Sequence, residues 1–396
     1  MAALSAVQES SFFQTGKTEK PFKPEKLLCR CFYSTRQDIN LNSFYVESNQ
    51  DLIDLVNNNN KGVKYLNASV DLEILKTECE KLENRAFSYF QLAAAQGYAP
   101  AQHNLGMMYD EGQGVTQDFT KAREWYEQAA EQGHAPSQHR LGNCYFYGKG
   151  VPQNDALAAE WYEKAVEQGY ADAQCNLGVM YSDGKGVPKD EEKAVRWYRK
   201  AADQGNAHAQ HNLGYCYFYG KGVSTNLNKA RKFFELAADQ GHAPSQCTLG
   251  GMSLNGKGVP KDLTKAREWY KLAADQGYAH AQCNLGFMYD YGKGVPKDLT
   301  KACEWYEEAA EQGHARAQYN LGLMYEYGKG VPKDLTKARE WYELAADQGY
   351  APAQNKLGVF YDLGKGVPKD LTKAREWYKL AADQGYAQAK FNSCWR

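Results

Sequence analysis

The feature that most constrains this chain is a 36-residue period with no insertion or deletion. Leucine–glycine pairs recur at that step, and their leucines are Leu105, Leu141, Leu177, Leu213, Leu249, Leu285, Leu321 and Leu357. A tryptophan keeps the same step, with Phe233 in its place once. Fixed periods of this length are typical of solenoids, in which single repeats cannot bury their apolar face and stacked repeats share a core. The full repeats are 99–134, 135–170, 171–206, 207–242, 243–278, 279–314, 315–350 and 351–386.

The first half of each repeat predicts a helix. In the repeat 315–350, Ala317, Gln318, Leu321, Gly322 and Tyr325 recur at steps of three and four residues, so they form one helical face. Glycine inside a helix costs about 1 kcal/mol relative to alanine. Its presence in all eight repeats therefore predicts that a neighbouring helix backbone comes too close for a side chain.

A Gly-Lys-Gly turn then separates the first helix from a second one. Asp334 is the expected N-cap of the second helix in its repeat, and Asn154 and Asn226 are the equivalents where aspartate is missing. The second helix is expected to end at Gly349, a C′ glycine. We expect the tryptophans to be core residues, with Trp269 buried between its own first helix and the next repeat.

Three motifs, Ala-x-Ala-Gln-x-x-Leu-Gly-x-x-Tyr, Gly-x-Gly-Val-x-x-Asp and Lys-Ala-x-x-Trp-Tyr-x-x-Ala-Ala, resemble those of Sel-1-like repeat proteins over residues 83–396. This family is related to the tetratricopeptide repeats. The resemblance implies an all-α fold, a right-handed α/α superhelical solenoid of helix-turn-helix repeats. It also implies a non-enzymatic scaffold or adaptor that binds a protein or peptide. A cysteine-rich branch of the family carries disulfides, but alanine stands at the first partner's position here, as at Ala201 and Ala273.

Outside the full repeats the sequence predicts less. Residues 1–27 are expected to form a disordered N-terminal tail, and residues 28–82 a small capping or targeting region. A half repeat is expected to begin at Glu83, and another at residues 387–396 is expected to cap the array. The alternative to a scaffold is a regulatory subunit or enzyme whose activity resides in residues 28–82.

The composition argues against nucleic acid and against insertion into a membrane. The formal net charge is −1 and the sequence pI is about 6.7, so no basic field across the chain favours nucleic acid. No apolar run approaches the roughly 18 residues that a membrane-spanning helix requires, and the N-terminus is a poor signal peptide. We expect a cytoplasmic protein without membrane insertion.

The candidate site comes from positions that differ between repeats. In the first helix these are positions 2, 5, 6, 9, 12 and 13, which trace one face opposite the fixed residues. In stacked helix pairs the first helix normally lines the concave side, so this face is the predicted groove for a partner with apolar anchors and some basic residues. Its candidate residues are His103, Asn104, Asp110, Glu111, His139, Arg140, Phe146, Tyr147, Asn176, Asp183, His211, Asn212, Tyr215, Phe218, Tyr219, Asn284, Phe287, Tyr291, Asn320 and Tyr327.

Two of these repeats share the sequence Cys-Tyr-Phe-Tyr-Gly-Lys-Gly-Val, at 144–151 and 216–223. The repeat between them carries Ser182-Asp183, so the sequence predicts a hollow with aromatic walls and an acidic floor for a basic or amidated peptide with one bulky apolar residue. The alternatives are a duplicated repeat pair without a shared ligand, aromatic residues that pack between first helices, and asparagines that only cap or solvate their helix.

Histidine and cysteine at position 5 of successive repeats do not predict a metal site. Equivalent residues of adjacent helices should lie about 8–10 Å apart, whereas zinc ligands lie about 2.0–2.3 Å from the metal. His208 and His211 are three residues apart, but the sequence offers no second pair for them. The sequence contains no recognisable arrangement of a nucleophile with a general base, so we expect no catalytic residue, no metal and no cofactor.

Overall fold

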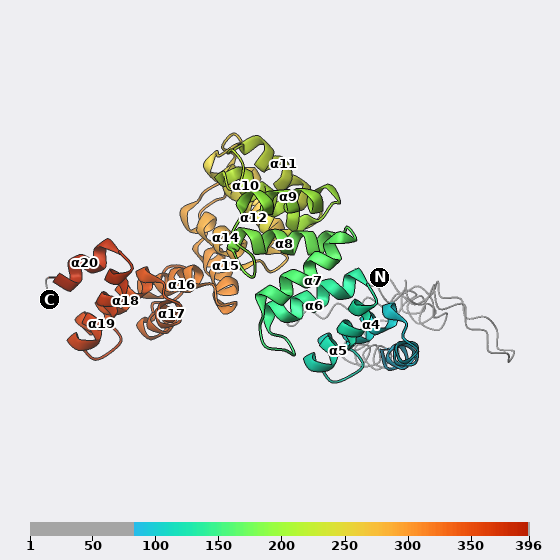
Figure 1. Cartoon of the computed structure of the whole chain (residues 1–396). Helices are drawn as coiled ribbons and strands as arrows, with labels where there is room; N and C mark the ends of the chain where they lie inside the picture. The colour runs from blue at the N-terminus through green and yellow to red at the C-terminus, as the bar shows by residue number, and fades with distance from the viewer. Residues whose placement is uncertain (1–82, 395–396) are drawn as a thin grey trace, which may run out of the picture. The chain divides into compact units, whose positions relative to one another are not determined.

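The computed structural model describes residues 83–394, with side chains described as far as residue 390, and the described residues form helices and no strand (Figure 1). The all-α solenoid of 36-residue helix pairs is therefore confirmed, whereas the predictions for residues 1–82 lie outside the described residues. Residues 83–95 are helical. The helices that follow are α4 Ala99–Glu111, α5 Phe119–Glu131, α6 Ala135–Tyr147, α7 Asp155–Glu167, α8 Ala171–Asp183, α9 Glu191–Asp203, α10 Ala207–Tyr219, α11 Leu227–Asp239, α12 Ala243–Asn255, α13 Leu263–Ala274, α14 Ala279–Tyr291, α15 Leu299–Glu311, α16 Ala315–Tyr327, α17 Leu335–Asp347, α18 Ala351–Leu363, α19 Leu371–Asp383 and α20 Ala387–Cys394.

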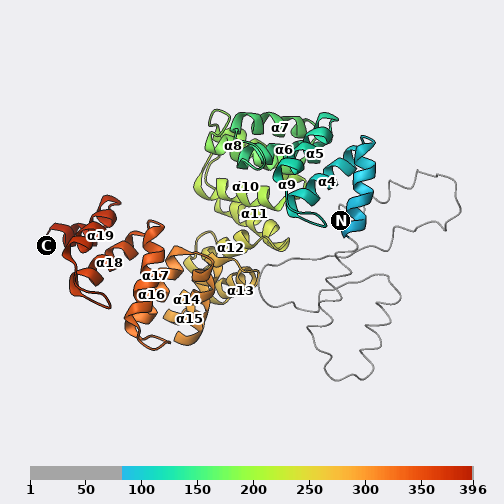
Figure 2. The same ribbon diagram turned by 90° about the horizontal axis from the view of Figure 1, so that it is seen from below.

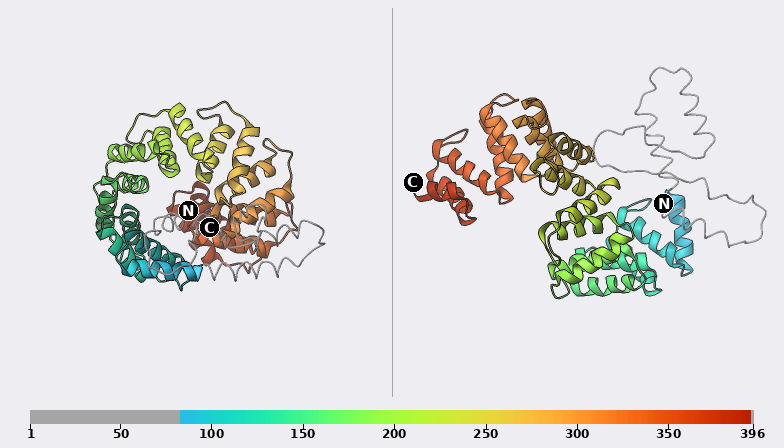
Figure 3. Two further views of the ribbon diagram at one scale, coloured as in Figure 1. Left: turned by 90° about the vertical axis from the view of Figure 1, so that its right-hand side faces the viewer. Right: turned by 90° about the horizontal axis from the view of Figure 1, so that it is seen from above.

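The described helices fall into two compact units, the first ending at Trp197 and the second beginning at Tyr198. Within a unit, a first helix packs against the second helix of its own repeat, and that second helix packs against the first helix of the next repeat (Figures 2 and 3). This pattern of contacts between neighbours is the one that defines a solenoid.

The predicted helix ends are confirmed. Oδ1 of Asp334 accepts hydrogen bonds from the backbone N–H groups of Thr336 and Lys337. Asn154 and Asn226 each accept one such bond, from the N–H of Leu157 and of Lys229. Gly349 follows the last turn of α17 with φ +81°, as expected for a C′ glycine. In first helices the left-handed glycine comes one position earlier, because the first glycine of the Gly-x-Gly turn is itself the C-cap, as Gly328 is at φ 67°, whereas Gln348 is the C-cap of α17.

The core corrects the prediction for the tryptophans. Tyr270, the neighbour of Trp269, is 2% exposed, whereas Trp269 itself is only half-buried. The equivalent Trp305 packs against a cluster formed by α13 and α14, so it contacts the preceding repeat and its own first helix rather than the next repeat. One helix cannot direct two adjacent side chains to the same side, and the tyrosine occupies the inner position.

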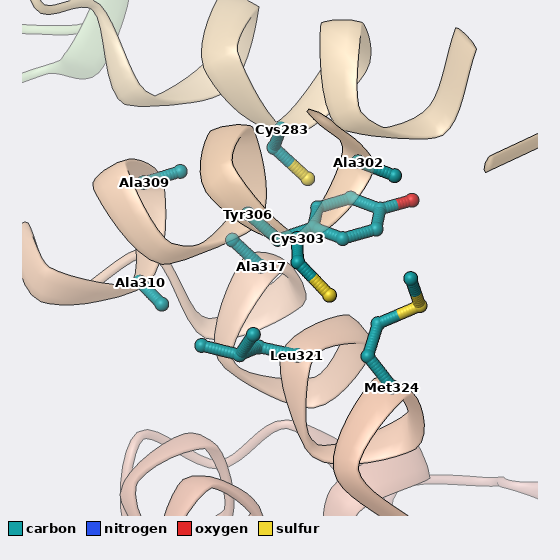
Figure 4. Packing of buried hydrophobic residues seen from close by; sticks show 9 residues of the cluster. All are labelled: Cys283, Ala302, Cys303, Tyr306, Ala309, Ala310, Ala317, Leu321 and Met324. Carbon is teal, nitrogen blue, oxygen red and sulfur yellow. The ribbon is translucent and has the colours of Figure 1, made fainter. Parts of the chain in front are cut away.

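The glycine of the leucine–glycine pair does allow a close approach, but the neighbour is mainly a side chain. A Cβ on Gly322 would lie 2.6 Å from Cε1 of Tyr342, and a Cβ on Gly286 would lie 2.6 Å from Cδ1 of Tyr306. The predicted backbone contact is thus corrected to the ring of the buried second-helix tyrosine. Figure 4 shows the cluster around one such ring, that of Tyr306.

The fixed glutamine connects neighbouring repeats through hydrogen bonds. Gln318 is buried and donates through Nε2 to the carbonyl of Ala310 in the preceding repeat, at 3.1 Å. Its Oε1 accepts from Nε2 of Gln348, at 2.8 Å, near the end of the same repeat. A buried amide is stabilised only when its donor and acceptor both have partners, which explains why this residue is fixed.

Candidate functional site

One surface of the first helices combines exposed aromatic rings with lysines. We call it the first-helix face and define it by positions 9, 12 and 13 of each first helix together with the lysine of each Gly-Lys-Gly turn. Its exposed tyrosines are Tyr147, Tyr215, Tyr219, Tyr291 and Tyr327, with 41–66% of their surface accessible. A turn lysine lies beside several rings of this face, and the Nζ of Lys257 is 4.0 Å from the ring centroid of Phe218.

The candidate residues at positions 5 and 6 mostly contact the neighbouring repeat. Nδ1 of His103 lies 2.9 Å from Oγ of Ser137, and His211 makes the equivalent contact with Ser245 at 2.9 Å. Other side chains in this group do the same or are buried: Asn176 contacts Nε2 of His139 and Oδ1 of Asn143, Asn284 contacts Sγ of Cys247, Asn104 is 7% exposed, and Asn212 is half-buried. These contacts join neighbouring first helices, and we therefore define the face without positions 5 and 6. For Asn176 and Asn284 they differ from the stated alternative, in which the asparagines only cap or solvate their own helix.

Burial keeps these histidines neutral at physiological pH. It lowers the pKa of His103 to about 3, with further lowering by His134, Arg140 and His139. Burial likewise lowers the pKa of His139 and of His211 to about 4. Charged histidines therefore take no part in the electrostatics of the first-helix face at neutral pH.

Acidic residues at position 12 form ion pairs across two repeat junctions. Glu326, 4% exposed, accepts a hydrogen bond from the Tyr342 hydroxyl at 2.8 Å and lies 2.9 Å from Nζ of Lys356 and 3.4 Å from Nζ of Lys365. Burial by itself would raise the pKa of Glu326, but the hydrogen bonds from Lys356 and Tyr342 and the charges of both lysines hold it below its usual value.

This arrangement predicts a pH-dependent stability. Because the pKa of Glu326 is lower in the folded chain than its unfolded value of 4.5, the folded state binds fewer protons and the stabilisation is complete above that value. It is lost as the pH falls through the folded pKa. We expect the free energy of unfolding of the native chain to fall relative to that of Glu326→Gln on acidification below pH 4.5, measured by urea denaturation at a series of pH values. A constant difference would contradict the expected coupling.

The first-helix face contains a hollow between α10 and α12. Gly251 occupies position 9, where the other repeats carry a larger side chain, and the space left has a volume of about 250 Å³. Three aromatic residues of α10 line it, namely Tyr215, Phe218 and Tyr219, together with Phe234, Thr248, Gly251, Met252, Asn255 and Lys257. Sequence reasoning missed Gly251, although a glycine found at this position in a single repeat was a signal that could have been read.

A second hollow lies between α14 and α16 and is more polar. It has a volume of about 150 Å³ and is lined by Phe287, Asp290, Tyr291, Tyr306, Arg316, Asn320, Leu323, Met324 and Lys329. Three of these, Phe287, Tyr291 and Asn320, were predicted site residues. The hollow predicted around Ser182-Asp183 would join residues of both compact units, namely Phe146 and Tyr147 with Phe218 and Tyr219, and it stays a prediction.

The remaining predicted residues lie at the junctions of the first unit. Arg140 and Lys149 lie 4.0 and 3.8 Å from the carboxylate of Asp110, and Glu111 and Asp183 are exposed. Phe146 is half-buried, with the Nζ of Lys185 5.3 Å from its ring centroid.

Comparison with known families agrees with this architecture. The Sel1 repeat model matches residues 78–98, 99–134, 135–170, 171–206, 207–242, 243–278, 279–314, 315–350 and 351–386. The chain belongs to the Sel1 repeat family. The resemblance expected from the sequence motifs is thereby confirmed, and proteins of this family generally mediate protein–protein interactions.

Two solved Sel1 repeat structures are similar to this chain. The protective antigen c5321 of uropathogenic Escherichia coli has a TM-score of 0.60 and 40% identity, over 78% of this chain and 66% of that one. A Sel1 repeat protein from Oxalobacter formigenes has a TM-score of 0.55 and 36% identity, over 76% and 88%. The mouse DAP3-binding cell death enhancer 1 is 41% identical over 59 residues, which are 14% of this chain and 12% of that protein. The chain thus covers only a small part of that curated relative.

Within the described part of this Sel1 repeat chain, no group of three or more histidine, cysteine, aspartate or glutamate side chains could hold a metal ion. His242 does join the pair that the sequence suggested, because its Nε2 lies 3.3 Å from Nδ1 of His208 and its ring centroid lies 5.0 Å from that of His211. The six cysteines among residues 83–390, whose side chains the structure describes, are thiols rather than disulfides. No helix in residues 83–394 combines the length and apolar composition that crossing a bilayer requires.

Proposed function

We propose that this protein is a non-enzymatic scaffold that binds a peptide or an exposed segment of a protein along the first-helix face, which we expect to line the concave side of the solenoid. The observation that carries the proposal is the hollow at Gly251, with Tyr215 and Tyr219 exposed at its rim. Aromatic residues around a concave apolar site are typical of the centres of protein interfaces. The anchor would be one bulky apolar side chain of the partner.

The chemistry of the hollow supports an apolar anchor. Phe218, Phe234 and Met252 form its walls, and Lys257 lies against the ring of Phe218. A side chain that enters would exchange water for aromatic contact, at about 25 cal/mol for each Å² of apolar surface buried. The polar groups of Thr248 and Asn255 at the same hollow would orient the backbone of the bound segment.

A cavity-filling variant tests this site. Peptides selected from a phage-displayed random library against the full chain should carry an apolar anchor, and Gly251→Leu should weaken their binding about 30-fold, as expected when a hot spot of about 2 kcal/mol is lost. The variant should stay folded, because leucine already occupies the equivalent position at Leu323 and a Cβ on Gly251 would meet only Oη of Tyr270, at 3.5 Å. Calorimetric titration of the selected peptides measures the loss.

The matched control is Leu272→Ala, since Leu272 is a second-helix residue with 50% of its surface exposed. We expect it to leave peptide affinity unchanged. If Leu272→Ala weakened binding while Gly251→Leu did not, the binding surface would lie on the second helices.

The rival proposal of an activity in residues 28–82 predicts that a chain without residues 1–82 loses function, whereas the scaffold proposal predicts that it keeps its peptide affinity. A reducing, cytoplasmic setting is part of the proposal and agrees with the cysteine thiols.

A further inference from the structure

Equivalent positions at three repeat junctions show which chemical group fills the space beside the acidic residue of position 12. At the junction of α4 and α6, Asp110 faces Arg140 at 4.0 Å and Lys149 at 3.8 Å. At the junction of α16 and α18, Glu326 faces Lys356 at 2.9 Å and Lys365 at 3.4 Å. In both cases a basic residue at position 6 of the next repeat and its turn lysine surround the carboxylate.

The tyrosine of the second helix completes this arrangement. Its hydroxyl lies 3.5 Å from Oδ2 of Asp110 in the first case, where the tyrosine is Tyr126, and 2.8 Å from Oε2 of Glu326 in the second, where it is Tyr342. At the second junction the ring of Tyr327 stands at position 13, whereas position 13 of the first junction is Glu111. Nζ of Lys356 lies 2.9 Å from Oε2 of Glu326, 3.1 Å from the Tyr327 hydroxyl and 5.2 Å from the centroid of that ring. At this junction the carboxylate and the Tyr327 ring thus form a place for one cation from the next repeat.

The junction of α14 and α16 has the same acceptors without that cation. Asp290, Tyr291 and Tyr306 occupy the equivalent places, but Asn320 stands at position 6, where the other junctions have Arg140 and Lys356. The shorter, neutral side chain leaves the hollow of about 150 Å³. Cavities of roughly that volume hold guests as large as benzene.

The two cations that line this hollow do not replace the missing one. The guanidinium carbon of Arg316 lies 5.9 Å from the ring centroid of Phe287, and Nζ of Lys329 lies 5.6 Å from that of Tyr327. Among the described residues, no ion pair within 4.0 Å joins either of them to Asp290. The equivalents of Lys329 at the other two junctions, Lys149 and Lys365, do reach their carboxylate.

We propose that the hollow at Asn320 binds a lysine or arginine side chain of the partner, which takes the place that Arg140 and Lys356 fill within the chain itself. Asp290 would accept from the guest cation, and Phe287 and Tyr291 would contact its aliphatic stem. This inference rests on the proposed function and specifies its partner further.

The two hollows would together select a short sequence pattern. They lie two repeats apart within one compact unit, the hollow at Gly251 between α10 and α12 and the hollow at Asn320 between α14 and α16. A partner segment that occupies both would carry a basic residue and an apolar anchor separated by the span of two repeats.

Single-residue probes test the hollow without any selected partner. N-acetyl-arginine amide, N-acetyl-norleucine amide and N-acetyl-glutamate amide are titrated into the full chain labelled with ¹³C-methyl methionine. Met324 lines the hollow at Asn320, and Met252 lines the hollow at Gly251. Because the chain has seven methionines, both methyl signals can be assigned by Met→Leu variants. We expect the arginine probe to shift the Met324 methyl signal saturably, with a Kd on the order of 1 mM, and the other two probes to shift it at least tenfold more weakly.

The decisive variant is Asn320→Lys, which would restore the internal cation and should weaken the arginine response at Met324 at least tenfold. The reverse variant, Lys356→Asn, should open an equivalent hollow beside Glu326 and add a second arginine site. A stronger response to the glutamate probe, an unchanged arginine response in Asn320→Lys, or no response to arginine would each overturn the inference. Gly251→Leu should leave the arginine response intact, so failure of the peptide site at Gly251 and failure of this site are separable.

Discussion

Tyr270→Ala should be among the most destabilising single substitutions in the second compact unit, with a loss of about 3–5 kcal/mol, as is typical when a large buried aromatic side chain is removed. Tyr270 is 2% exposed and lies in the cluster of α13 and α14 with Leu285 and Met288. Its ring also fills the space that Gly250 leaves open, since a Cβ there would lie 2.7 Å from Cδ1. The substitution therefore leaves a cavity at the centre of a helix pair.

Trp269→Ala is the matched control, because it removes a larger aromatic side chain from the adjacent position. Trp269 is half-buried, so we expect a smaller loss, about 1–2 kcal/mol. Urea denaturation followed by circular dichroism of both variants and the native chain measures the two losses. An equal loss in both variants, or a greater loss for Trp269→Ala, would contradict the assignment of tyrosine to the inner position.

Gly330→Ala should have an effect of similar size through the backbone. Gly330 has φ +74°, and a Cβ there would lie 2.2 Å from the backbone carbonyl oxygen of Leu299 in the preceding second helix. An alanine in the left-handed conformation costs roughly 1–2 kcal/mol, and overpacking typically adds about 1–3 kcal/mol. Because a backbone carbonyl within a helix cannot rotate away, the two repeats would have to separate locally, and we expect a total loss of about 2–5 kcal/mol.

Gly349→Ala separates the two contributions. Gly349 has φ +81°, similar to that of Gly330, but a Cβ there would meet no atom within 4 Å. This control should therefore lose only the conformational part, about 1–2 kcal/mol. Thermal and urea denaturation of both variants give the difference, which reports the contact between Gly330 and Leu299. Equal losses would mean that the turn can move away from α15 without a cost in free energy.

The repeat itself was determined by sequence alone. The 36-residue step, the caps at Asp334 and Asn154 and the C′ glycine at Gly349 are local signals, because each depends on residues within a few positions of one another. Period and caps together define two helices per repeat, and a unit of that size is stable only when stacked. The fold class needed no information beyond them.

The identity of the inner aromatic residue was decided by tertiary packing. Trp269 and Tyr270 are adjacent and both apolar enough for a core, so periodicity does not say which one faces the first helix. The ring of Tyr270 lies over Gly250, and that contact depends on how the two helices pack. The same dependence explains why the glycine was expected to meet a backbone and meets a ring instead.

For the candidate site as well, the sequence identified one part and tertiary packing decided the rest. Variation between repeats identified the surface of the first helices and several residues of both hollows, including Tyr219 and Asn320. It did not show that His103 contacts the next repeat and Asn176 the preceding one, because a side chain's partner across a junction depends on the stacking of the helices. Nor did it show that Gly251 and Asn320 leave space, since a hollow exists only where neighbouring repeats fail to fill it. Sequence therefore determined the periodic helices and their surface, while the tertiary contacts between repeats decided where that surface is open.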